Sequence, residues 1–374
     1  MNFTQNENQR ELAALSRRIL TGRLTPERLA EAEAGGDRFD AALWADLAGA
    51  GILAAGLPES LGGAGLGLLE QCSVLIEIGR TVAPAPYLAS IVLGASAVAR
   101  FGTPDQRRRW AAPAGCGELI LTAALAEEDG DDPAMPSASA EPVSRDGGWL
   151  LSGVKTAVPA APLADLLLVP AATPGGAAVF LVSPADEGVT VARQQITAGD
   201  SAARVTLAAV RLAGDRVLGS PASGREMAGW LVSRGTVGLC ALQLGVAERA
   251  LELTAAYAQS RVQFGKPIGG FQAVSQRLAD AYIDVEAIRL TMWQAAWLLA
   301  AGLPCATEVA TAKFWAADAG HRVAHTAVHV HGGVGIDLDS PLHRYFTAAK
   351  GNEFTLGGAT AQLRRIGSAL ASSG

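Results

Sequence analysis

Apolar side chains recur every three or four residues through the first third of the chain. Leu12, Leu15 and Ile19 share one helical face, and the pattern returns at Leu43 and Leu47. This spacing predicts amphipathic helices. Further helices are expected near Ile91 to Phe101 and after Thr103-Pro104, because a hydroxyl residue followed by proline commonly begins a helix.

The hydrophobic period changes after about residue 118. Short β-prone runs follow, separated by glycine, proline and aspartate. The runs lie at 119–122, 149–153, 166–169, 178–182 and 189–191. Their lengths and spacing predict a small β-domain, either a barrel or a sandwich.

Helical spacing returns after about residue 222. We expect one long helix ending near Ser260, a second over 271–301, a third from Ala306 to about Val330, and a last one starting near Gly357. The chain therefore divides into three predicted parts. They are an N-terminal helical domain at 1–118, a central β-domain at 119–221 and a C-terminal helical bundle at 222–374, which together make an α+β protein.

Composition narrows the class of protein. The 374 residues suffice for a large core, and a net charge of −6 without a basic stripe argues against nucleic-acid binding. No apolar run reaches the roughly 20 residues of a membrane span, and the polar N-terminus does not resemble a signal peptide. The four cysteines form no CxxC pair, which favours a reducing cytoplasm. Cys72 and Cys240 lie in apolar helical runs and are expected to be buried.

Two segments carry candidate binding chemistry. Arg261-Val262-Gln263-Phe264-Gly265 places a fixed cation, an amide and an aromatic ring at the end of a helical run. His329-Val330-His331-Gly332-Gly333-Val334-Gly335 supplies a glycine-rich turn whose backbone can approach a ligand closely. A guanidinium suits a pyrophosphate, and a ring suits an adenine or flavin face. Together the two segments predict a dinucleotide site built on helices.

These segments resemble those of the acyl-CoA dehydrogenase flavoprotein family, and the resemblance covers essentially the whole chain. Each motif alone is weak, but four in the same order are specific. The matching segments are Pro58-Glu59-Ser60-Leu61-Gly62-Gly63, Phe101-Gly102-Thr103-Pro104-Asp105-Gln106, Arg261-x-Gln263-Phe264-Gly265 and Gly332-Gly333-x-Gly335.

The resemblance implies a fold and a reaction. It implies an N-terminal α-helical domain, a central small β-barrel and a C-terminal four-helix bundle. It also implies FAD, a CoA thioester substrate and transfer of electrons to an electron-transfer flavoprotein. In the family a carboxylate removes the α-proton, and the homotetramers share their flavins between subunits.

The family's catalytic carboxylate is absent from its usual position. Its Glu-Gly-Thr-x-Gln segment reads Gly358-Ala359-Thr360-Ala361-Gln362 here, so the base position falls on Gly358. Gly235 lies at the alternative position that some members use. Glu353 remains a weak candidate for the base, although a surface or salt-bridge role fits it better. Asp337 and Asp339 are more readily interpreted as turn residues.

The flavin side of the central domain also departs from the family. The family's Thr-Glu-Pro-x-x-Gly-Ser-Asp stretch corresponds to the acidic segment 126–133, which carries no hydroxyl. Carboxylates beside a flavin would disfavour its anionic reduced form. The family's Trp-Ile-Thr segment corresponds to Ala157-Val158-Pro159.

The segments that match the family and the segments that depart from it have different roles in the family. What the chain would give to a neighbour's FAD is kept, and what it would need for its own chemistry is lost. The chain therefore resembles the auxiliary subunit of actinobacterial heterotetrameric acyl-CoA dehydrogenases that shorten steroid side chains. The resemblance implies two catalytic and two auxiliary chains, FAD shared at the interface, and a sterol-derived acyl-CoA, such as a cholesterol side-chain intermediate, bound mainly by the catalytic partner.

Individual side chains receive expected roles, each weighed against a structural one. Arg261 is the strongest candidate as a pyrophosphate ligand. Phe264 also fits a ring in the core of the bundle, and Gln272 also fits an exposed residue at the start of a helix. His329 stands where the family usually has glutamine. The complete cofactor-binding set is Arg261, Gln263, Phe264, Gln272, His329, Gly332, Gly333, Thr360 and Gln362. No metal site is expected, although His325 and His329 are four apart, because no acidic ligand lies between them.

Two other functions stay open. The chain could be a self-sufficient homotetrameric acyl-CoA dehydrogenase with an unrecognised base. It could also be a flavin-free scaffold or an acyl-CoA-binding module.

Overall fold

Ten short helices form the first layer among the described residues. The computed structural model describes residues 3–128, 130, 132–143 and 147–372. The helices are α1 (Glu7–Arg23), α2 (Pro26–Ala34), α3 (Ala41–Gly49), η1 (Glu59–Leu61), α4 (Leu68–Thr81), η2 (Leu88–Ala95), α5 (Ser96–Phe101), α6 (Pro104–Gln106), η3 (Arg107–Ala111) and α7 (Ala112–Gly115). Thr103 caps α6 as predicted, with its hydroxyl accepting from Gln106 N at 3.2 Å. The helix expected over 91–101 is two elements, because η2 is a π-helix that passes into α5.

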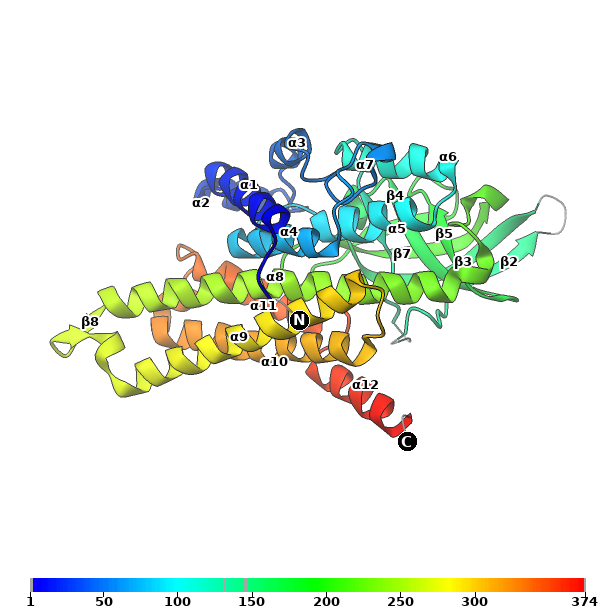
Figure 1. Ribbon diagram of the computed structural model, residues 1–374. Coiled ribbons are helices and arrows are strands. Elements are labelled where there is room, and N and C mark those ends of the chain that lie inside the picture. Colours follow the sequence, from blue (N-terminus) through cyan, green and yellow to red (C-terminus); the bar gives the residue numbers. More distant parts are fainter. Residues whose placement is uncertain (1–2, 129, 131, 144–146, 373–374) are drawn as a thin grey trace.

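A seven-stranded sheet forms the second part. Its strands are β1 (Leu121–Ala123), β2 (Ser139–Val143), β3 (Gly148–Pro159), β4 (Leu166–Thr173), β5 (Gly176–Val182), β6 (Val189–Arg193) and β7 (Ala202–Leu212). The spatial order is β1-β4-β2-β3-β7-β6, with β5 also paired to β4. The five predicted runs are confirmed, whereas β2 and β7 were not predicted. Within the described residues β1 and β6 do not pair, so the predicted small barrel is a curled, open half-barrel (Figure 1).

The C-terminal part is a helical bundle built around one very long helix. Its elements are α8 (Gly224–Ser260), β8 (Val262–Gln263), β9 (Lys266–Pro267), η7 (Ile268–Gly270), α9 (Gln272–Ala300), α10 (Ala306–His331), η8 (Gly332–Ile336), α11 (Leu342–Phe354) and α12 (Ala359–Ser372). The four predicted helices are confirmed as α8, α9, α10 and α12, and α11 was missed. Short 3-10 turns η4 (Ala161–Leu163), η5 (Gly214–Arg216) and η6 (Pro221–Ser223) complete the chain.

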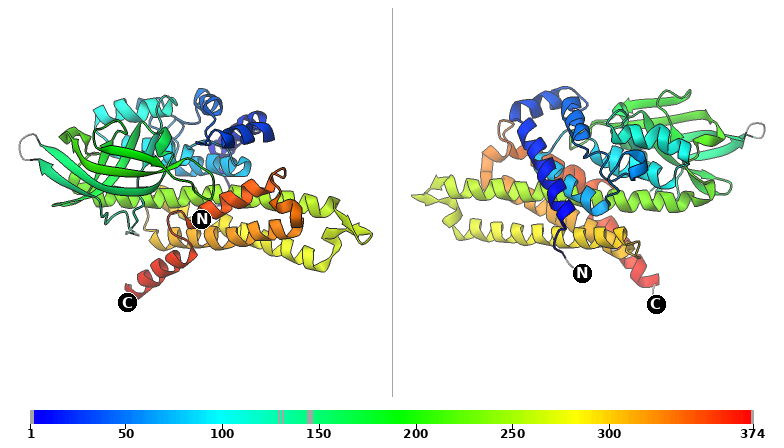
Figure 2. Two further views of the ribbon diagram at one scale, coloured as in Figure 1. Left: turned by 180° about the vertical axis from the view of Figure 1, so that it is seen from behind. Right: turned by 45° about the horizontal axis from the view of Figure 1, so that its top comes forward.

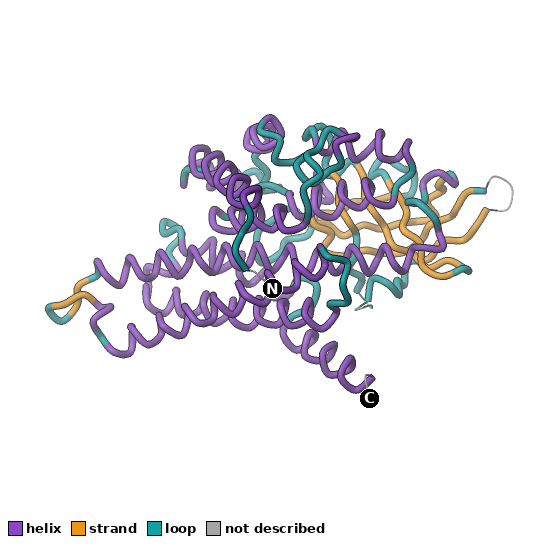
Figure 3. Tube along the Cα trace, in the orientation of Figure 1, coloured by secondary structure: helices purple, strands orange, loops and turns teal. Residues whose placement is uncertain are grey.

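Helix α8 connects all three parts. One end lies against the sheet, and the other carries the β8–β9 hairpin at the far tip of the bundle (Figures 1 and 3). The segment 221–260 is long and apolar enough to cross a membrane, but 72% of its most apolar window is buried inside the protein. It is therefore accounted for as a core helix. Helix α12 projects away from the bundle, and its last described residues are exposed (Figure 2).

Close backbone approach explains why α4 packs tightly on α8. A Cβ on Gly79 would lie 2.1 Å from the carbonyl oxygen of Leu242, and one on Gly245 would lie 2.0 Å from that of Ile76. Only glycine fits at these crossings. The same core buries Cys72 and Cys240 completely, as predicted.

Candidate functional site

The hairpin at the end of α8 presents the first predicted binding segment. The helix ends where Arg261 N donates to Tyr257 O at 2.8 Å. The turn that follows is formed by Phe264 at φ 50° and Gly265 at φ 79°, and Phe264 is 94% exposed. Arg261 and Gln263 are also exposed, and no ion-pair partner of Arg261 occurs among the described residues. The segment thus holds out a cation, an amide and a ring that the chain itself does not cover.

The glycine turn at the end of α10 presents the second segment. Gly332 has φ 62° and ψ −138°, a conformation that favours glycine. A Cβ on Gly332 or Gly333 would meet nothing within 4 Å, so their backbone faces open space. Gly335 is needed for a different reason, because a Cβ there would lie 2.9 Å from Val328 O.

An aromatic stack joins these two segments. The Tyr257 and His331 rings lie 4.3 Å apart between centroids, with planes inclined by 22°. His331 Nδ1 lies 2.8 Å from Ala327 O. Tyr257 was not singled out from the sequence, and His331 was named only as part of the glycine-turn segment, because nothing in the local pattern links residues so far apart in the chain.

A groove of about 720 Å³ runs between α9 and α10 from the second segment. Exposed His329 lines this groove, whereas exposed Gln272, the first residue of α9, does not. The groove is lined by Arg277, Asp280, Ala281, Ile283, Asp284, His321, Arg322, His325, Thr326, Val328 and His329. Burial lowers the pKa of His325, and the neighbouring His321 and Lys350 lower it further.

The segment that should carry a catalytic carboxylate carries none. Gly358 has no side chain, and a Cβ there would lie 3.5 Å from Glu353 O, an ordinary contact. The Glu353 carboxylate turns instead to Lys350 Nζ, 2.6 Å away, and to His321 Nδ1, 3.2 Å away. Gln362 has no exposed surface, and its Nε2 donates to the carbonyls of Leu356 and Gly357. Gln362 thus fixes the turn, whereas Thr360 is exposed.

The alternative position on α8 is closed by leucines. A Cβ on Gly235 would lie 3.2 Å from Leu356 Cδ1 and 3.4 Å from Leu93 Cδ2. Leu356 itself is held in the left-handed region at φ 59°. A carboxylate at this position would require both leucines to move.

Lys313 of α10 binds the end of α11, close to the empty base position at Gly358. This fully buried lysine donates to Asn352 O at 2.8 Å and to Glu353 O at 3.0 Å, the carbonyls of the last turn of α11. Burial lowers the pKa of Lys313 to about 8. It is a second residue that the sequence analysis missed, since a lysine in an apolar helix gives no signal of the carbonyls it meets.

Two carboxylates of the acidic stretch in the central domain have ion-pair partners. Lys155 Nζ lies 2.6 Å from Glu127 Oε1, and Arg204 pairs with Glu128. Burial alone would raise the pKa of Glu127, but hydrogen bonds from Lys155, Ala138 N and Ser137 N outweigh it and hold the pKa below its ordinary value. Asp129 and Asp131 lie outside the described residues. The expected field of unpaired carboxylates does not extend to Glu127 or Glu128.

The bulge at Ala157 carries backbone strain without a large side chain. Ala157 lies in the left-handed region at φ 46°, and its N–H donates to Gln194 Oε1 at 2.7 Å. Strain of this kind concentrates at functional sites. At this bulge the Ala157 side chain is only a methyl group.

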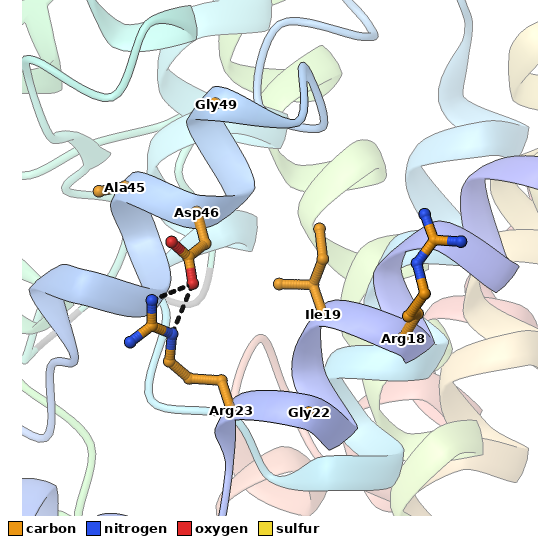
Figure 4. A pocket seen from close by; sticks show the side chains of 7 residues that line it. All are labelled: Arg18, Ile19, Gly22, Arg23, Ala45, Asp46 and Gly49. Atoms are coloured by element: carbon orange, nitrogen blue, oxygen red, sulfur yellow. Dashed lines mark hydrogen bonds and ion pairs between the residues drawn. The ribbon is translucent and has the colours of Figure 1, made fainter.

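A separate groove of about 610 Å³ lies on the helical layer. Figure 4 shows Arg23 of α1 reaching to Asp46 of α3 across it, with Ile19 alongside. None of the predicted cofactor residues lines it. No group of three potential metal ligands occurs in the described part of the chain.

The hairpin and the glycine turn fit the outer half of a dinucleotide. An unpaired guanidinium, an uncovered ring and bare backbone are what a pyrophosphate and its nucleoside require. The stacked Tyr257 and His331 place these groups at one end of the bundle. The catalytic part of the site is incomplete, because neither position 358 nor position 235 carries a carboxylate.

Known proteins of one family are similar to this chain in sequence and structure. The model of the acyl-CoA dehydrogenase N-terminal domain matches residues 6–118, and that of the C-terminal domain matches 222–371. Acyl-CoA dehydrogenase FadE27 of Mycobacterium tuberculosis is 48% identical, with 99% of each chain covered. In the ChsE4-ChsE5 complex from M. tuberculosis, a chain is 49% identical, with a TM-score of 0.94 and 99% of both chains covered. A chain of the Tcur3481-Tcur3483 steroid ACAD is 42% identical, with a TM-score of 0.92 and 98% of both covered.

Proposed function

The chain belongs to the acyl-CoA dehydrogenase family, and from that premise we propose that it is the auxiliary subunit of a heterotetrameric enzyme. Two copies pair with two copies of a catalytic family member. The chain lends FAD contacts to that partner and supplies no catalytic base. The assembly introduces a double bond between the α and β carbons of a CoA thioester.

One observation carries the proposal. The groups suited to FAD point away from the chain's own body, with Phe264 94% exposed, while Gly358 and Gly235 leave both base positions without a carboxylate. A self-sufficient enzyme requires the catalytic base as well as the FAD-binding groups. A subunit that only lends contacts to its partner requires the FAD-binding groups alone.

Exposed apolar side chains near the glycine turn favour a protein partner on this face. Val334, Ile336 and Leu338 are 47%, 72% and 75% exposed. Apolar groups of this size gathered near a binding segment commonly mark an interface. We assign them to contact with the catalytic chain.

The assigned FAD contacts divide by chemistry. Arg261 neutralises the pyrophosphate, Gln263 and His329 hydrogen-bond to it or to the adenosine, and Phe264 packs on a ring face. Gln272, Gly332, Gly333 and Thr360 border the cofactor, and Gln362 acts through the turn that it fixes. When bound, FAD supplies the oxidant that accepts the β-hydride; the α-proton goes to the partner's carboxylate.

The relatives suggest a substrate class. The solved relative at 42% identity is a steroid ACAD, and the one at 49% identity is a chain of the ChsE4-ChsE5 complex. We infer a CoA thioester of a sterol side chain, held mainly by the partner, with an electron-transfer flavoprotein as acceptor and the cytoplasm as location.

The deciding experiment counts flavins. The chain is expressed alone and together with a catalytic acyl-CoA dehydrogenase of the same organism, and native mass and FAD per chain are measured. We expect a colourless, inactive lone chain and a tetramer with one FAD for every two chains. A lone chain that binds one FAD per copy and oxidises acyl-CoAs would establish the homotetramer instead.

A matched pair of substitutions tests the lending role. Arg261→Ala should weaken FAD binding by the complex about 10- to 100-fold, the effect expected of a charged hydrogen bond. Arg225→Ala, an exposed arginine at the opposite end of α8, should leave binding unchanged. Unchanged FAD content in both variants would favour the flavin-free scaffold.

A further inference from the structure

The two segments that would hold the partner's FAD lie at the C-terminal ends of two different helices that meet at one end of the bundle. Arg261 follows the end of α8, and Gly332 follows the end of α10. The segments are far apart in the chain, so their spacing depends on how these two helix ends meet. A cofactor clasped by both is sensitive to that spacing.

Tyr257 acts on both sides of this junction. Its carbonyl oxygen accepts from Arg261 N at 2.8 Å, the backbone bond at the C-cap of α8, after which the chain becomes extended. Its ring stacks on His331, the last residue of α10, at 4.3 Å. Tyr257 thus lies one turn before the first segment, and its ring contacts the residue immediately before Gly332.

His331 is held in a single orientation. Its Nδ1 lies 2.8 Å from the carbonyl oxygen of Ala327, one turn earlier on α10, so this nitrogen carries the proton and donates. The Tyr257 face then fixes the plane of the ring, with an inclination of 22°. The backbone continues directly into Gly332 at φ 62°, where the chain turns toward open space.

We propose that the Tyr257–His331 stack is a positioning pair that holds Arg261 and the Gly332–Gly333 backbone at the separation that FAD requires. The inference rests on the proposed lending of FAD contacts and deepens it. Neither ring touches the cofactor in this account. The pair acts through the two segments that it joins.

The test uses the complex with its catalytic partner, stripped of flavin and titrated with FAD. His331→Ala should raise the FAD dissociation constant about 5- to 10-fold, the range expected from loss of one aromatic pair. His331→Phe keeps a ring against Tyr257 and should restore affinity to within about twofold. The visible circular dichroism of bound FAD should change in His331→Ala and recover in His331→Phe.

Controls separate positioning from general stability. Phe101→Leu removes an aromatic contact with Trp230 at the other end of α8. It should lower the melting temperature without changing FAD affinity. A His331→Ala variant with lower melting temperature but unchanged FAD affinity would overturn the positioning role. If Arg261→Ala weakens FAD binding and His331→Ala does not, this inference fails alone; if neither does, the proposed function fails as well.

Discussion

The carboxylate of Glu353 faces the ammonium group of Lys350, with Oε2 2.6 Å from Nζ and one turn of α11 between the two residues. His321 Nδ1 approaches the same oxygen at 3.2 Å. The carboxylate is thereby engaged on the bundle side of its helix. Glu353 has its partners within the chain and needs no substrate to explain its presence.

Replacing Glu353 should therefore leave catalysis intact. Glu353→Gln should change the dehydrogenation rate of the complex by less than about twofold, whereas removing a true general base costs about 10²- to 10⁴-fold. Stopped-flow reduction of the flavin by substrate measures the rate. Glu286→Gln, which breaks a similar pair with Arg289 on α9, is the matched control. A hundredfold loss confined to Glu353→Gln would identify it as the missing base.

The stability of the chain should tolerate a new carboxylate at one of the two empty base positions and not at the other. Gly358 O accepts from Gln362 N at 3.2 Å, which places Gly358 at the start of α12. Aspartate is favoured there, so Gly358→Asp should change the unfolding free energy by less than about 0.5 kcal/mol. Gly235→Asp inserts a charge between Leu356 and Leu93 and should cost about 2 kcal/mol or more.

Urea unfolding of the two variants, followed by circular dichroism, checks this difference. Gly235→Ala serves as a control for bulk alone. Equal losses at 358 and 235 would mean that the space at Gly358 is less open than its 3.5 Å contact implies.

Phe264 should be a residue whose removal stabilises the isolated chain. It occupies the left-handed region at φ 50° and is 94% exposed, so it has backbone strain and little burial. Phe264→Gly should raise the unfolding free energy by up to about 1 kcal/mol, because glycine adopts this conformation freely. The same change should weaken FAD binding by the complex.

A second substitution separates strain from the ring. Phe264→Leu keeps a Cβ in the strained conformation but removes the aromatic face. It should lower FAD affinity without raising stability. If Phe264→Gly destabilised the lone chain, the ring would have a structural role within the chain itself.

The sequence predicted the parts of the fold that have a local sequence signal. The long bundle helices have clear 3.6-residue periods, and Thr103 has its capping partner three residues on. Strand β7 was missed because Ala202–Leu212 is rich in alanine, which has low strand propensity. Its place is set by pairing with β3 and β6. Helix α11 was missed because its stability depends on distant partners, among them the bond from Tyr345 to Arg80 O.

The site divides in the same way. Arg261, Phe264 and the paired glycines were assigned because they lie in short segments that are local in sequence, and their role toward FAD stays a prediction. The Tyr257–His331 stack and the carbonyls that Lys313 meets could not be predicted, because each contact joins helices whose packing no local pattern specifies. Gln362 was assigned to the cofactor, yet its amide donates to Leu356 O and Gly357 O.

Lys313 should make stability depend on pH in the alkaline range. Burial lowers its pKa from 10.5 to about 8 in the folded protein. Between these two values the unfolded chain keeps a proton that the folded chain has lost. The unfolded state then binds more protons, so the free energy of unfolding rises with pH across this window and is flat below it.

Lys313→Met removes the titrating group and isolates this contribution. The difference in unfolding free energy, wild type minus variant, should grow from pH 8 to pH 10.5 by at most about 3 kcal/mol, since each pKa unit corresponds to about 1.4 kcal/mol. The variant also leaves Asn352 O and Glu353 O without this donor, a loss that does not vary across the window. Taking the difference cancels other groups that titrate in this range. A constant difference across the window would show that Lys313 keeps its proton in the folded protein.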